Sequence, residues 1–135
     1  MLFRSERAFI ETQASAELLF AQLSGFAAPR VAQLARAQLA VAFTDVLDLP
    51  GDPRRAWALR ERATAETHLG DLGAAEQTLQ TALRVLEQTS AGRAGRYLII
   101  ADLAANAWQR GDSGLATRLY AQSQEIGRAS CRERV

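Results

Sequence analysis

The residues best suited to chemistry are few, and their spacing does not support a reaction. His68 is the only histidine and Cys131 the only cysteine in the 135-residue chain, so neither a histidine-rich metal site nor a Cys-His nucleophile can be assembled from them. Asp71 and Asp112 resemble a pair of catalytic acids. Each follows a glycine that ends a helical pattern, however, where an aspartate caps the next helix. We therefore expect no enzyme activity, no cofactor and no metal site.

The charged residues also exclude several classes of partner. The chain has 16 basic residues, all of them arginines, against 15 acidic ones, and its net charge is +1. This balance lacks the basic excess of proteins that bind nucleic acid or membrane surfaces. Arg54-Arg55 and Arg60-Glu61-Arg62 form a short basic cluster, which we interpret as a solvated helix face or as helix pairing rather than as a phosphate site. Without an apolar run of roughly 20 residues or a secretory signal, the chain is predicted to be cytoplasmic.

Two segments of the sequence have the same spacing of residues and indicate an internal repeat. Gly70-Asp71 is followed by Ala75, Leu79 and Ala82, and Gly111-Asp112 is followed at the same offsets by Ala116, Tyr120 and Ser123. Each segment predicts a helix, a glycine turn and a second helix. A unit that occurs twice is typical of arrays in which each helix pair buries its apolar face against the next.

Helical spacing of apolar residues extends over most of the chain. We expect an all-α fold of six helices in three antiparallel pairs, at about 5–46, 53–88 and 96–125, within one domain that covers residues 1–125. Residues 88–95 are predicted to form a loop because they include two glycines and several polar residues. No segment shows the two-residue alternation of a β-strand.

The spacing of small residues around the two glycines resembles the tetratricopeptide repeat. Ala63 and Ala104 stand seven residues before their glycines, and Ala75 and Ala116 stand five residues after them. Gly111 follows Gly70 by 111 − 70 = 41 residues, whereas a standard tetratricopeptide unit has about 34. In this length, and in its arginine-rich, lysine-free composition, the chain is similar to the helical regions of large bacterial transcription regulators. The resemblance implies that the pairs stack into an α-solenoid.

In such an array the first helix of each pair lines a concave groove that binds a protein or peptide. By this resemblance the groove would be lined by Trp57, Arg60, Thr64 and His68 from one helix and by Leu98, Ala101, Ala105, Trp108 and Gln109 from another. Tryptophan and arginine are enriched at binding hot spots. The alternative for both tryptophans is packing between repeats, and for His68 a surface position. Only Arg60 fits the clamp that some members of the family use for a C-terminal carboxylate, so that ligand is not predicted.

The last ten residues have an unusual origin in our interpretation. Residues 126–135, IGRASCRERV, back-translate into a string that resembles a sequencing-library adapter read in frame. Such a scar is excluded from fold reasoning. We expect this segment to be non-native and disordered or irregular, so Cys131 is no indication of redox chemistry. The natural protein would then be longer than this fragment.

The leading functional hypothesis is a non-catalytic module that binds a protein or peptide. One alternative is the ligand-sensing or oligomerisation region of a bacterial transcription regulator or signalling protein. Another is the helical part of an enzyme whose active site lies outside this fragment. We expect no direct contact of this fragment with nucleic acid and none with a membrane, and self-association through exposed end helices is left open.

Overall fold

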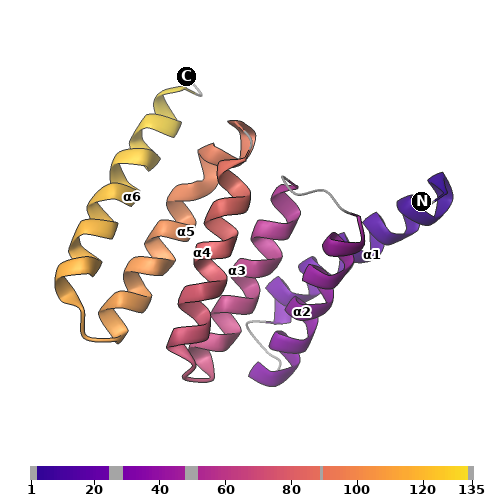
Figure 1. Cartoon of the computed structure of the whole chain (residues 1–135), viewed down its shortest axis with the longest axis horizontal. Coiled ribbons are helices and arrows are strands. Elements are labelled where there is room, and N and C mark those ends of the chain that lie inside the picture. Colours follow the sequence, from indigo (N-terminus) through magenta and orange to yellow (C-terminus); the bar gives the residue numbers. More distant parts are fainter. Residues whose placement is uncertain (1–2, 25–28, 48–51, 89, 134–135) are drawn as a thin grey trace.

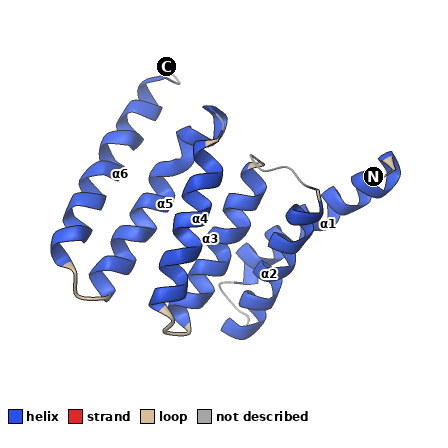
Figure 2. Ribbon diagram, viewed as in Figure 1, coloured by secondary structure: helices blue, strands red, loops and turns tan. Residues whose placement is uncertain are grey.

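The computed structural model describes residues 3–24, 29–47, 52–88 and 90–133. Within them the chain forms six helices and no strand (Figure 2). The helices are α1 (Arg4–Ser24), α2 (Arg30–Val46), α3 (Pro53–His68), α4 (Leu72–Glu87), α5 (Ser90–Gln109) and α6 (Ser113–Glu133). The expected all-α class and the number of helices are therefore confirmed for this part of the chain.

The two glycine turns have the same structure. Gly70 and Gly111 both have φ of +86°, a left-handed conformation that glycine adopts without steric penalty. In each turn the glycine N–H bonds to the carbonyl three residues earlier, and the aspartate N–H bonds to the carbonyl five residues earlier, which is the Schellman pattern of a helix end. Asp71 then accepts a hydrogen bond from the Ala74 amide at 3.1 Å, and Asp112 accepts one from Leu115 at 2.9 Å. Both aspartates are helix caps, as predicted.

The helices lie in a row that follows their order in the chain (Figure 1). Each packs against its neighbours in sequence, and α1 and α3, like α3 and α5, also touch each other. Among the described residues no contact joins α3 to α6, as a closed bundle of the last four helices would require. The core consists of buried side chains from α2, α3, α4 and α5.

The repeated pattern places its small residues in the interior of the fold. Ala63, Ala75, Ala104 and Ala116, the four alanines of the repeated pattern, are all buried. The large residues of the pattern differ from each other, because Leu79 is 3% exposed and Tyr120 is 42% exposed. Leu79 belongs to α4, which packs against both α3 and α5, whereas in the described residues α6 packs only against α5.

The loop expected at residues 88–95 is largely absent, because α5 begins at Ser90. Residue 89 lies outside the described residues. The glycines that suggested a loop are contact positions instead. Gly92 is buried, and a Cβ added at Gly95 would lie 3.0 Å from two atoms of the Trp57 ring. Glycine is needed here because another helix packs closely, not because the chain turns.

The irregular tail expected at residues 126–135 is also wrong for residues 126–133, which continue α6 to Glu133; residues 134 and 135 lie outside the described part. Ala116, Ser123 and Ser130 follow one another at intervals of seven and are all buried. The Ser123 hydroxyl donates to the Tyr97 carbonyl at 2.8 Å, and the Ser130 hydroxyl donates to the Ala94 carbonyl at 3.2 Å. A row of small residues at this spacing keeps one helix face against α5, so the segment is helical whatever its origin.

Removing residues 126–135 is therefore expected to destabilise the start of α5. The deletion takes away Ser130 and the half-buried Ile126, and we expect the free energy of unfolding to fall by about 1–2 kcal/mol. Hydrogen exchange should report faster exchange in residues 90–97. Replacement of the exposed Arg132 by alanine is the control and should change neither quantity. Unchanged protection of residues 90–97 after the deletion would contradict the packing of the tail.

Candidate partner-binding groove

The four predicted groove residues of α3 share one face of the helix. Trp57, Arg60, Thr64 and His68 follow one another at spacings of three or four residues, which places their side chains above one another. His68 is exposed, whereas Trp57 is half-buried against the core. Because the Trp57 ring lies against Gly95, its observed contacts are those of packing between α3 and α5.

The predicted residues of α5 include the most exposed aromatic ring of this region. Trp108 is 64% exposed, while Ala101, Ala105 and Leu98 are half-buried and Gln109 is exposed. Ala101, Ala105 and Trp108 are spaced by four and three residues and lie on one helix face. Trp108 is thus available to a partner in a way that Trp57 is not.

A small pocket lies between α3 and α5, with α4 at one side. Its volume is about 100 Å³. Four of the predicted groove residues line it: Thr64, His68, Ala105 and Gln109. The remaining lining residues are Ala63, Thr67, Leu79, Asp102 and Asn106. Trp57, Arg60, Ala101, Leu98 and Trp108 are not among the lining residues, so the pocket is narrower than the predicted groove.

An ion pair connects the two groove helices. Nε of Arg60 donates to Oδ2 of Asp102 at 2.5 Å, and a terminal guanidinium nitrogen lies 3.3 Å from Oδ1. The hydrogen bond with Asp102 raises the pKa of Arg60. Paired in this way, Arg60 is held in one orientation. Arg60 was predicted as a groove residue, but its partner was missed, although Asp102 stands three and seven residues before Ala105 and Gln109 on the same helix face.

Glu61 adds a second acidic group beside this pair. Its carboxyl is half-buried, and burial raises its pKa, while Arg60 and a hydrogen bond with Gln33 act in the opposite direction. Arg60 thus has two carboxylates near it, from Glu61 and Asp102. This side of α3 is polar and acidic, which suits a partner that presents hydrogen-bond donors or a positive charge.

Buried polar side chains hold the groove helices against α4. The Asn106 amide donates to the Leu72 carbonyl at 2.9 Å. In α3, Glu66 is buried and accepts bonds from Arg62 at 2.7 Å and from the Thr78 hydroxyl at 2.8 Å. At the surface, Arg110, which follows α5, pairs with Glu76 of α4. Each bond has a preferred geometry, so together they set the position of α3 and α5 relative to α4.

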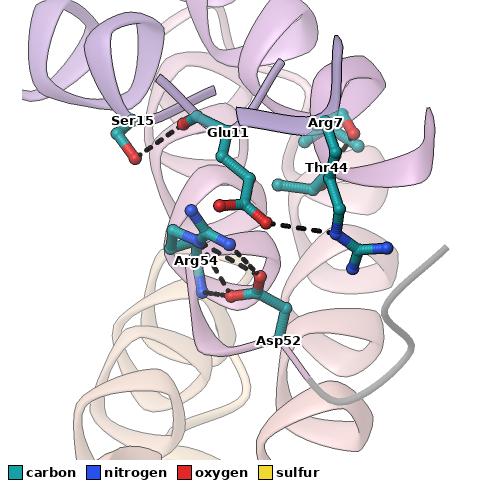
Figure 3. Close-up of polar contacts among 7 residues, drawn as sticks. Arg7, Glu11, Ser15, Thr44, Asp52 and Arg54 are labelled. Carbon is teal, nitrogen blue, oxygen red and sulfur yellow. Dashed lines mark hydrogen bonds and ion pairs between the residues drawn. The ribbon is translucent and has the colours of Figure 1, made fainter. Parts of the chain in front are cut away.

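A separate polar cluster lies at the start of α3, where α1 passes over it (Figure 3). Arg54 forms an ion pair with Asp52 at 2.6 Å, and Arg7 forms one with Glu11 at 3.4 Å. The hydrogen bond from Arg54 lowers the pKa of Asp52, which also caps α3 by accepting from the Arg54 amide. The other arginines of the predicted basic cluster are also in ion pairs, with Asp45, Asp102 and Glu66. The cluster therefore corresponds to the helix-pairing interpretation rather than to a solvated face.

Comparisons with known proteins do not identify the class of protein to which this chain belongs. No family model, no curated protein and no solved structure matches this chain. Among the described residues no group of three or more acidic, histidine or cysteine side chains is placed to hold a metal ion. None of the helices described combines the length and the apolar character that crossing a membrane requires.

Proposed function

We propose that this chain is a tetratricopeptide-like α-solenoid of antiparallel helix pairs, and that it binds a protein or peptide without catalysis. The observation that carries this proposal is the pocket between α3 and α5, which contains Thr64, His68, Ala105 and Gln109. These residues come from the first helices of two successive pairs. In a stacked array that is where a bound segment would lie.

The arrangement of helices supports the solenoid. Contacts join neighbours in sequence and the pairs α1 with α3 and α3 with α5, while α2 and α4 do not meet among the described residues. The first helices of successive pairs thus lie closer to each other than the second helices do, as expected where a row of helix pairs is curved. The identical Schellman turns at Gly70 and Gly111 would make the last two pairs equivalent units.

The groove offers a partner one aromatic anchor and a rigid polar surface. Trp108 provides a large exposed ring, and tryptophan is among the residues that contribute most to interfaces. Arg60 is already paired with Asp102, so little side-chain entropy is lost when a partner contacts it. We propose that the bound segment places an apolar side chain against Trp108 and polar or basic groups near Asp102 and Glu61.

A selection from a random peptide library tests the proposal. Peptides enriched on the wild-type chain are measured by calorimetry against Trp108→Ala and Gln109→Arg, for which we expect Kd to rise by about 10-fold or more. Gln77→Arg, on the exposed face of α4, is the matched control for the second variant and should bind like the wild type. Failure to enrich any peptide, or equal affinity for all variants, would refute the groove as the binding site.

A further inference from the structure

The outer face of α2 is apolar although it is exposed. Val31, Ala35, Leu39, Ala42 and Val46, here called the α2 outer face, follow one another at spacings of three or four residues and are all exposed. Val31 is 65%, Leu39 48% and Val46 54% exposed. The opposite side of the helix is buried through Gln33, Ala37, Ala40, Val41 and Thr44. A helix that is apolar on two opposite sides is typical of one covered on both.

The second helix of the next pair lacks such a face. Ala37, Ala40, Val41 and Thr44 of α2 correspond in spacing to Ala75, Thr78, Leu79 and Ala82 of α4, and all eight are buried. In this register, Ala35, Leu39, Ala42 and Val46 correspond to Gly73, Gln77, Gln80 and Arg84, which are also exposed. The position equivalent to Leu39 is therefore a glutamine. An outer face that meets only water needs no leucine or valine, as α4 demonstrates, so the apolar residues of α2 require another explanation.

We propose that the α2 outer face binds the same face of a second copy of this chain, with the two helices antiparallel. In this arrangement Leu39 of one copy lies opposite Ala42 of the other, and Val46 lies opposite Ala35. Each of these layers combines one large and one small side chain, which fills the interface without a void or a clash, while Val31 extends past the end of the partner's α2. The face is thus complementary to itself about a two-fold axis.

The helix dipoles favour this antiparallel pairing, because antiparallel helices place their dipoles in opposition. The charged residues of α2 do not compete with it, since Arg36 pairs with Glu17 at 3.0 Å and Asp45 pairs with Arg55 at 2.9 Å within the chain. The face itself carries no charged residue, so none is buried on pairing. This proposal does not depend on the groove, which lies on α3 and α5.

Sedimentation equilibrium over a range of concentrations tests the pairing. We expect the wild type to dimerise reversibly with a Kd in the micromolar range. Leu39→Glu would bury a carboxylate in each copy and should weaken the dimer by about 100-fold or more. Gln77→Glu, at the equivalent position of α4, is the control and should leave the dimer unchanged. Circular dichroism should show that both variants retain the helical content of the wild type.

Cysteine cross-linking tests the direction of the helices. In a Cys131→Ser background, the double variant Ala35→Cys/Val46→Cys should link two copies under oxidation, whereas Ala35→Cys alone should not, because the two copies of that position lie about 16 Å apart. Efficient linking by the single variant would show parallel helices and overturn the arrangement. A wild type that stays monomeric, or a dimer that Leu39→Glu leaves intact, would overturn the proposal. Binding of the monomer to phosphatidylcholine vesicles, lost in Leu39→Glu, would instead assign the face to lipid.

Discussion

Replacement of Ala75 by arginine is expected to abolish the folded state or to lower the free energy of unfolding by about 4 kcal/mol or more. Ala75 lies in the first turns of α4, is fully buried and belongs to the main hydrophobic core. An arginine there would force a long side chain and a charge into a space that holds one methyl group. Since domains of this size have a total stability of roughly 5–15 kcal/mol, a single substitution of this kind removes much of it.

The equivalent substitution in the next pair provides a second measurement with a matched control. Ala116 is also fully buried, and Ala116→Arg should destabilise strongly. Ala121→Arg introduces the same residue on the same helix at an exposed position and should change the free energy of unfolding by less than about 0.5 kcal/mol. Thermal and urea unfolding measure both. An unchanged melting curve for Ala75→Arg or Ala116→Arg would contradict the equivalence of the two glycine-centred units.

The second large effect is expected from Ile99→Ala in α5. Ile99 is one of the two largest fully buried side chains among the described residues, and it belongs to the core cluster. Removing three carbon atoms from it leaves a cavity that the helices cannot collapse to fill, and we expect a loss of about 2–5 kcal/mol in urea unfolding. The loss should exceed that of any exposed substitution in the groove, because it affects the contact of α5 with the rest of the core.

Ile10→Ala is the control for this prediction. Ile10 lies in α1 and is half-buried, so the same chemical change removes less buried surface and should cost about 1 kcal/mol. The m-value should stay constant in both variants if the transition remains cooperative. If Ile99→Ala cost no more than Ile10→Ala, the core would not extend to α5 as described.

Much of the local structure could be predicted from sequence because it depends on neighbours along the chain. The Gly70 and Gly111 turns follow from the need for positive φ at a helix end, and Asp71 and Asp112 follow as caps. The buried alanines follow from helical spacing. The loop predicted at residues 88–95 was wrong because glycine occurs both in turns and at close helix contacts. The contact of Gly95 with Trp57 joins residues that are distant in sequence, so the local pattern could not reveal it.

The candidate groove shows the same division between local and distant information. Helical spacing placed Thr64 and His68 on one face and Ala105 and Gln109 on another, and the structure brings all four to one pocket. The distance from Arg60 to Asp102 could not be obtained in this way, because it depends on how α3 and α5 are rotated against each other. The different exposure of Trp57 and Trp108 likewise depends on which neighbour each ring meets.

The sequence by itself determined most of the helices, the caps Asp71 and Asp112 and the buried alanines, since hydrogen bonds within a helix and the 3.6-residue period are local properties. Only the tertiary structure decided which side chains meet across helices. It paired Arg60 with Asp102, continued α6 over residues 126–133, and left the α2 outer face exposed. The physical reason is that packing depends on the rotation and separation of whole helices, which many weak contacts determine together.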